Sequence, residues 1–171
     1  MQRQATTDGL TGLMNHRAFY DALERELWRS RRYGGTIALI MADIDSLKRI
    51  NDTRGHRAGD EVIKEVSQRI RECVRQIDLA ARYGGDEFAI ILPNTGVEDA
   101  LVVCERIVEA VSRSPITWRG EEISLSISVG VGQYDGDANP EDITNRSDEA
   151  LYSAKQAGKN TVRVFQSAQH E

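Results

Sequence analysis

An unbroken run of six apolar residues, 37–42, constrains this 171-residue chain more than any other feature of its sequence. Such a run is typical of a strand that is buried on both faces, and it is far shorter than the roughly 20 residues that a membrane-spanning helix needs. Asp43 and Asp45 follow the run directly. It therefore predicts a central strand that ends in carboxylates within a region of low dielectric constant, where an uncompensated charge is costly.

Apolar spacing alternates between helical and strand periods along the rest of the chain. Spacings of three and four residues predict helices near 19–34, 62–74, 97–111 and 140–158, and a short polar helix is expected over 46–52. The helix near 62–74 is expected to begin at Gly59-Asp60. Strands are predicted over 79–83, 88–92, 125–131 and 161–165. The core order, βααββαβ, predicts an α+β, ferredoxin-like fold with helices covering one face of a largely antiparallel sheet.

Composition and charge indicate one folded domain, over residues 1–171 with its core at about 8–166. Apolar residues make up 40% of the chain and charged residues 29%, which argues against disorder. The net charge of −5 argues against a broad surface for nucleic-acid polymers. Cys73 and Cys104 lack the spacing of a disulfide framework or a zinc site, and the first residues do not resemble a signal peptide. A cytoplasmic location is therefore expected.

Two glycines, Gly84 and Gly85, separate two of the predicted strands and indicate a tight hairpin turn with positive φ angles. Asp86 and Glu87 follow them. If this hairpin neighbours the strand over 37–42, three or four carboxylates converge at one sheet edge. Oxygen ligands without His or Cys suit Mg²⁺ shared with substrate phosphates, as in phosphoryl and nucleotidyl transfer. Spacing alone leaves a second interpretation open, in which Asp43 caps the next helix and the glycine turn is an ordinary solvated loop.

The string Gly84-Gly85-Asp86-Glu87-Phe88, preceded by Arg82-Tyr83, resembles the signature of the GGDEF family of diguanylate cyclases. Other strings resemble family motifs in the same order: Asp8-Gly9-Leu10-Thr11-Gly12-Leu13 with Asn15 and Arg17; Asp43-Ile44-Asp45 with Lys48, Asn51 and Asp52; Gly55-His56 and Gly59-Asp60; and Ala150-Leu151-Tyr152 with Lys155, Gly158, Lys159 and Asn160. The resemblance covers residues 8–165, nearly the whole chain. It implies a palm-type fold related to those of adenylyl cyclases and polymerases.

The resemblance also implies a reaction, in which two GTP molecules form cyclic di-GMP and two pyrophosphates are released. Each 3′-hydroxyl attacks the α-phosphorus of the other GTP, so two copies of the domain must face each other as a homodimer. Mg²⁺ or Mn²⁺ is the implied cofactor. Family members usually carry an upstream sensory or receiver module, so the domain is expected in the cytoplasm either alone or as part of a membrane-attached sensor.

Two other functions stay open at this point. One is a noncatalytic domain that senses GTP or cyclic di-GMP, although the retained Asp86 and Glu87 favour an enzyme. The other is a cyclase that makes mixed or adenine dinucleotides. Asp60 disfavours this second function, because adenine has no N1–H for a carboxylate to accept.

The resemblance assigns roles residue by residue. Asp43, Asp86 and Glu87 would be the catalytic carboxylates and would bind the metal with the carbonyl of Ile44, Glu87 acting either as a ligand or in proton uptake. Asn51 and Asp60 would read guanine. The remaining substrate-binding residues would be Lys48, Gly84, Gly85, Lys155 and Lys159. The last two lysines are four apart and are expected on one face of the final helix, within reach of the phosphates. Leu47 departs from the family pattern, which commonly has Phe there.

Arg75 and Asp78 resemble the family's RxxD inhibitory site, which lies five residues before the GGDEF string. Arg106 matches a further arginine of that site. The resemblance implies that cyclic di-GMP binds there, as an intercalated dimer, and holds the domains in a nonproductive arrangement. The alternative is a surface salt bridge between Arg75 and Asp78, which would contribute little to stability.

Overall fold

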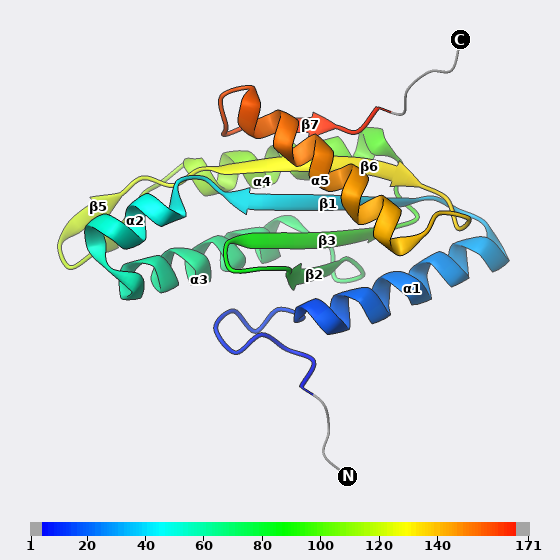
Figure 1. Ribbon diagram of the computed structural model, residues 1–171, viewed down its shortest axis with the longest axis horizontal. Helices are drawn as coiled ribbons and strands as arrows, with labels where there is room; N and C mark the ends of the chain where they lie inside the picture. The colour runs from blue at the N-terminus through cyan, green and yellow to red at the C-terminus, as the bar shows by residue number, and fades with distance from the viewer. Residues whose placement is uncertain (1–4, 167–171) are drawn as a thin grey trace.

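The computed structural model describes residues 5–166, and its central element is a five-stranded sheet in the order β2-β3-β1-β6-β7 (Figure 1). The strands are β1 (Ile37–Ile44), β2 (Leu79–Arg82), β3 (Glu87–Pro93), β6 (Ile127–Tyr134) and β7 (Val162–Val164). β1 pairs antiparallel with β3 on one side and β6 on the other, and β7 runs parallel to β6. The predicted α+β, ferredoxin-like fold and its largely antiparallel sheet are confirmed.

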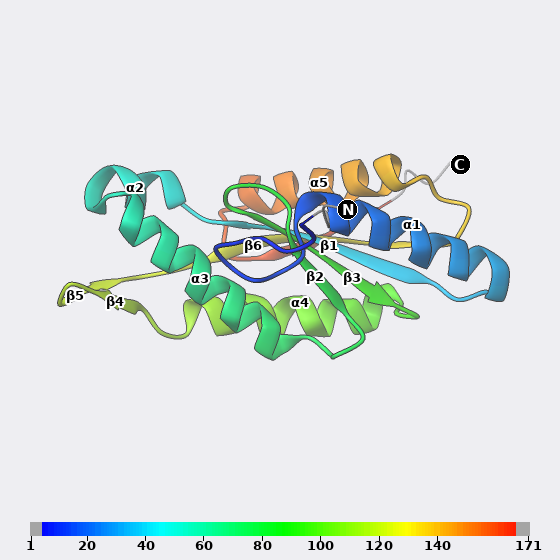
Figure 2. The same ribbon diagram turned by 90° about the horizontal axis from the view of Figure 1, so that it is seen from below.

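Helices cover both faces of the sheet, so the expectation of a single covered face is wrong (Figure 2). α1 (His16–Tyr33) and α5 (Pro140–Gln156) pack on the face of Leu39 and Met41. α3 (His56–Cys73) and α4 (Val97–Ser112) pack on the face of Ala38 and Ile40. The physical reason lies in β1, whose residues 37–42 are all buried, because an apolar run leaves neither face suited to water. Among the described residues, no helix has the length and apolar character needed to span a membrane.

The helix α3 begins at His56, earlier than the predicted start at Gly59-Asp60. Gly55 ends α2 (Leu47–Arg54) and starts α3 in one step, with a φ of 92° that favours glycine. Gly59 therefore lies inside α3, where it is buried beneath the side chain of Asn51. A Cβ atom at position 59 would collide with Asn51 Oδ1, so glycine at this position leaves room for the Asn51 side chain between α2 and α3.

Two features of the loops were not predicted. A small hairpin of β4 (Ile116–Trp118) and β5 (Glu121–Ile123) extends from one end of the molecule (Figure 1). In addition, neither Gly84 nor Gly85 has a positive φ angle, so that prediction is wrong. The turn is wider than a two-residue hairpin, because the backbone N–H groups of Tyr83 and Gly84 both donate to the carbonyl of Glu87.

Small residues bring the backbone of α5 against β6. A Cβ atom at Gly130 of β6 would collide with the backbone of Ser147 and Leu151 in α5. Ser147 Oγ also donates to the carbonyl of Leu39 at 3.1 Å and is within 2.9 Å of Tyr134 Oη. The position of α5 over the sheet is thus fixed by close backbone contact, and this helix carries Lys155.

Candidate active site

The end of β1 and the turn before β3 bring three carboxylates together. Asp43 lies opposite Glu87 in the β1–β3 register, and Ile44 N donates to the carbonyl of Asp86 at 3.0 Å. One carboxylate oxygen from each of Asp43, Asp86 and Glu87 lies within 4.8 Å of the others. The backbone pairing of two strands therefore assembles an acidic cluster, as the sequence predicted if the hairpin neighboured the central strand.

Asp45 does not join this cluster, so three carboxylates converge rather than four. Its buried side chain accepts hydrogen bonds from Ser126 Oγ at 2.7 Å, Ser128 Oγ at 2.6 Å and the backbone N of Asn160 at 3.0 Å. These three donors satisfy the charge of Asp45 within the protein. Its role in the structure is to join β1, β6 and the segment after α5.

Asp43 is incompletely satisfied by the protein. Its Oδ2 lies 2.5 Å from Lys155 Nζ, whereas its Oδ1 is buried and has no hydrogen-bond partner within residues 5–166. Burial, together with the negative charge of Asp86, raises the pKa of Asp43 to about 7, although the hydrogen bond and charge of Lys155 act in the opposite direction. A buried carboxylate oxygen without a donor, beside two further carboxylates, has the electrostatics of a cation site.

Glu87 shares this environment. Burial raises its pKa, and the negative charges of Asp148 and Asp86 add to the effect. Asp148 of α5 was missed by the sequence analysis, and its signal was available, because it stands seven residues before Lys155 and hence on the same side of that helix. Two residues of α5, Lys155 and Asp148, therefore flank the cluster of three carboxylates.

The alternative that Asp43 caps the next helix is wrong. The N-cap of α2 is Ser46, which has a left-handed backbone and makes no side-chain capping bond. Asp43 makes its ion pair with Lys155 instead.

The glycine turn is braced by Arg82 rather than being a free solvated loop. Arg82 Nη2 donates to the carbonyl of Gly85 at 2.8 Å, and Arg82 Nε to that of Gly84 at 3.2 Å. Arg82 Nη1 also pairs with Asp8 at 3.2 Å. Burial alone would raise the pKa of Asp8, but hydrogen bonds from Thr11 and the charge of Arg82 outweigh it and lower the pKa. The segment around Asp8 therefore supports the turn that carries Asp86.

The predicted substrate-binding residues fall into two groups. Lys155 lies in the last turn of α5 and contacts the cluster through Asp43. The others contribute no ion pair to the cluster within residues 5–166: Lys48 and Asn51 lie on α2, Asp60 lies on α3, and Lys159 follows α5. The prediction that Lys155 and Lys159 share one helix face is wrong, because α5 ends at Gln156 and Gly158 and Lys159 have φ angles of 110° and 65°.

The predicted inhibitory site is a preformed charge pair. Arg75 Nη2 lies 2.9 Å from Asp78 Oδ1, Arg75 Nε lies 3.2 Å from Oδ2, and Arg75 Nη2 also donates to Thr95 Oγ1. The Asp78 side chain is 0% exposed and that of Arg75 is 52% exposed. The pair lines a cavity of about 410 Å³. Arg106 lies nearby and donates to the carbonyl of Cys73, the last residue of α3.

Comparison with known proteins identifies relatives along nearly the whole chain. The family described as "Diguanylate cyclase, GGDEF domain" matches residues 5–161. Diguanylate cyclase DgcP of Pseudomonas aeruginosa is 43% identical over 164 residues, covering 95% of this chain and 24% of DgcP. Response regulator PleD of Caulobacter vibrioides is 44% identical over 161 residues, covering 92% of this chain and 36% of PleD. The chain thus spans well under half the length of these curated relatives.

Solved structures agree with the sequence comparison. The GGDEF domain of DgcB from Caulobacter crescentus, in complex with c-di-GMP, superposes with a TM-score of 0.93 at 37% identity and covers 98% of this chain and 99% of its own. The active GGEEF domain of a diguanylate cyclase from Vibrio cholerae has a TM-score of 0.84 at 32% identity and covers 91% and 99%. The resemblance carried by the motifs is confirmed, and the chain belongs to the GGDEF domain family of diguanylate cyclases.

Proposed function

We propose that this chain is a diguanylate cyclase domain that condenses two GTP molecules into cyclic di-GMP and releases two pyrophosphates. The observation that carries the proposal is the cluster of Asp43, Asp86 and Glu87, in which a buried carboxylate oxygen has no partner among the described residues. Curated relatives of the same family are named diguanylate cyclases, which supports the reaction.

The three carboxylates, together with the carbonyl of Ile44, would hold Mg²⁺ or Mn²⁺. The donor set is all oxygen, which suits these hard cations. When bound, the cation supplies neutralisation of the triphosphate and lowers the pKa of the attacking 3′-hydroxyl. Glu87 has a raised pKa and can serve as a ligand or take up a proton.

The surrounding side chains would bind and orient GTP. Lys155 now neutralises Asp43, and with a cation present its ammonium group is free to bind phosphate. Lys48 and Lys159 are exposed and would add positive charge around the triphosphate, while Gly84 and Gly85 would let the phosphates approach the backbone.

Guanine selection would come from the facing sides of α2 and α3. The Asn51 amide can bond the O6 and N3 edges of guanine, and the exposed Asp60 carboxylate can accept from N1–H and N2–H₂. The close contact of Asn51 with Gly59 supports this placement, since it puts the amide at the junction of the two helices. We therefore expect GTP to be used in preference to ATP.

Two copies of the domain would be needed for turnover, because each copy offers one nucleotide site and the reaction joins two nucleotides. We also propose that the product binds at Arg75, Asp78 and Arg106 and inhibits the enzyme. The half-exposed guanidinium of Arg75 supports this proposal, since it retains N–H groups that can reach a ligand phosphate. The DgcB domain was solved with c-di-GMP, which shows that a close structural relative binds this dinucleotide. Relatives such as PleD, a response regulator, further suggest control by an attached module.

One incubation tests the reaction. The purified chain is given GTP or ATP with Mg²⁺, with and without EDTA, and the products are separated by chromatography. We expect cyclic di-GMP and pyrophosphate in a 1:2 ratio from GTP alone, and no product with EDTA. Nucleotide binding without turnover, even in a forcibly dimerised protein, would contradict the proposal and favour a noncatalytic sensor. A product from ATP would instead indicate an adenine or mixed cyclase.

A further inference from the structure

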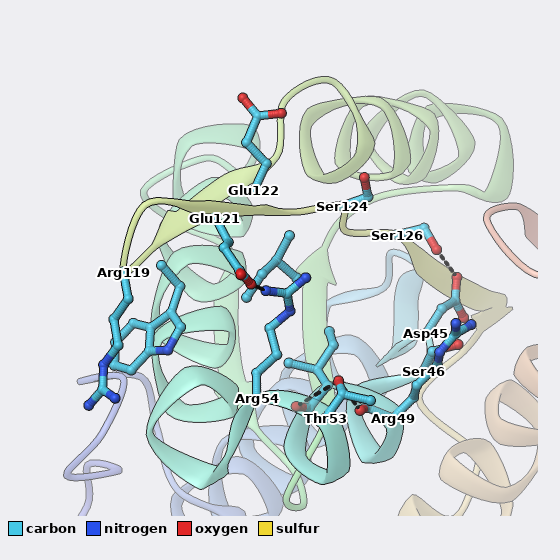
Figure 3. Close-up of a pocket in the computed structure, with 13 residues that line it drawn as sticks. Asp45, Ser46, Arg49, Thr53, Arg54, Arg119, Glu121, Glu122, Ser124 and Ser126 are labelled. Atoms are coloured by element: carbon cyan, nitrogen blue, oxygen red, sulfur yellow. Dashed lines mark hydrogen bonds and ion pairs between the residues drawn. The ribbon is translucent and has the colours of Figure 1, made fainter.

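A cleft with a volume of about 820 Å³ lies between α2 and the β4–β5 hairpin (Figure 3). One wall is the side of α2 that carries Ser46, Arg49, Thr53 and Arg54. The opposite wall is formed by hairpin residues, including Glu121. Asn51 does not line the cleft and instead lies over Gly59 of α3. The helix α2 therefore separates this cleft from the proposed guanine-binding side.

The helix α2 packs against α3 on one side and faces the cleft on the other. It is eight residues long, and helices of this length are marginal without tertiary support. Leu47 and Ile50 are its buried residues, and its N-cap Ser46 makes no side-chain capping bond. An open cleft along one side leaves space into which the helix can shift.

One ion pair crosses the cleft. Arg54 Nη1, from the last residue of α2, pairs with Glu121 Oε2 of β5 (Figure 3). Within residues 5–166 this is the one side-chain hydrogen bond or ion pair that joins α2 to the hairpin. The Arg54 side chain is 31% exposed and that of Glu121 is 70% exposed, so the pair is partly screened by solvent.

We propose that the Arg54–Glu121 pair positions α2, and through it Asn51, for guanine binding. The inference rests on the proposed function, because it assigns a positioning role at that nucleotide site. Loss of the pair would free α2 to shift relative to the hairpin and would displace Asn51 relative to Asp60 of α3. The carboxylates are held by the pairing of β1 with β3, in which α2 takes no part. The expected effect is therefore on GTP affinity rather than on the chemical step.

The test compares two single variants, their charge swap and a matched control. The variants are Arg54→Gln, Glu121→Gln and the double variant Arg54→Glu/Glu121→Arg. The control is Glu122→Gln, because Glu122 is the next residue of β5, its side chain points away from Arg54 in Figure 3, and it makes no ion pair within residues 5–166. KM and kcat are measured with GTP, and the Kd of a nonreactive GTP analogue is measured by calorimetry.

Each single variant is expected to raise KM for GTP and the analogue Kd by about two- to fivefold, with kcat unchanged, as suits a partly exposed pair. The charge swap should restore both constants to within about twofold of the wild type, and Glu122→Gln should match the wild type. The proposal would be overturned if KM and Kd were unchanged in the single variants. It would also be overturned if the charge-swap variant bound GTP and the analogue as weakly as either single variant.

The experiment distinguishes failure of the proposed reaction from failure of the proposed positioning role. If the wild type makes no cyclic di-GMP, the proposed reaction fails, and the analogue Kd values still decide whether the pair positions α2. If the wild type binds no analogue at all, both are wrong.

Discussion

The acidic cluster and the Arg75–Asp78 site each contain a buried carboxylate, and the protein treats the two in opposite ways. Asp78 receives two hydrogen bonds from the Arg75 guanidinium and one from the Arg75 backbone N. Asp43 has one lysine, a buried oxygen without a partner among the described residues, and a raised pKa. An unmet charge indicates a place for an ion from solution, whereas the Asp78 carboxylate is already paired within the protein.

The largest effect is expected from a substitution that removes one carboxylate of the acidic cluster. We expect Asp86→Ala to reduce turnover of GTP by roughly 10³-fold or more, because it removes a carboxylate from the proposed metal site. The measurement is the initial rate of cyclic di-GMP formation at saturating Mg²⁺. Asp137→Ala, which removes an exposed loop carboxylate, should leave the rate unchanged. Retention of a substantial rate by Asp86→Ala would remove this residue from the metal site.

The second prediction concerns Asp45, the aspartate that follows β1 and lies outside the acidic cluster. Asp45→Ala should destabilise the fold by about 2–4 kcal/mol, because it leaves two serine hydroxyls and a backbone N–H without their acceptor. Thermal unfolding with EDTA should show a fall in Tm of about 5–15 °C. The exposed Asp21→Ala provides the control. A Tm equal to that of the wild type would show that Asp45 is not the structural junction inferred here.

The third prediction concerns the Arg75–Asp78 ion pair. Arg75→Ala should weaken cyclic di-GMP binding by about tenfold or more while turnover continues, because a charge-assisted contact to phosphate is lost. Calorimetry with cyclic di-GMP measures the affinity, and progress curves show whether turnover still slows as product accumulates. Arg113→Ala, at the end of α4, serves as the control. An unchanged affinity would contradict the assignment of this site.

The smallest expected effect concerns the raised pKa of Asp43 and the pH dependence of stability that follows from it. The folded protein retains the Asp43 proton up to about pH 7, whereas the unfolded chain releases it near the ordinary value of 3.8. Stability that depends on this group is therefore present at low pH and is lost as the pH rises from about 4 to 7. In EDTA, Asp43→Asn should raise Tm by a few degrees at pH 8 and by much less at pH 5. The same Tm difference at both pH values would contradict the raised pKa.

The sequence predicted most of the fold because the strongest patterns in it are local. The apolar run at 37–42 predicted the position of β1 in the sheet, and periodic spacing predicted the approximate ranges of the four long helices. The same run also indicated two covered faces, and the single covered face predicted from the element order was therefore avoidable. The β4–β5 hairpin escaped prediction because its strands have three residues each and mixed polarity.

The candidate site was predictable to the extent that strand pairing determines it. Asp43 and Asp86 meet because β1 and β3 are neighbours, a relation that residue patterns left open and that the family resemblance implied. The separation of Asp45 from the cluster depends on which donors surround it, and those donors come from residues more than 80 positions away in the chain. The brace formed by Arg82 and Asp8 is likewise a tertiary contact, and no local pattern indicates it.

The close contact between Gly130 and α5 has a consequence for mutational scanning. Any side chain at this position would push the α5 backbone away from the sheet and would carry Lys155 with it, although Gly130 itself lies within β6. A screen scored by activity alone would rank position 130 among the residues that perform chemistry. Scoring protein abundance in parallel would separate the two classes, since a variant at 130 should also lower the amount of folded protein in the cell.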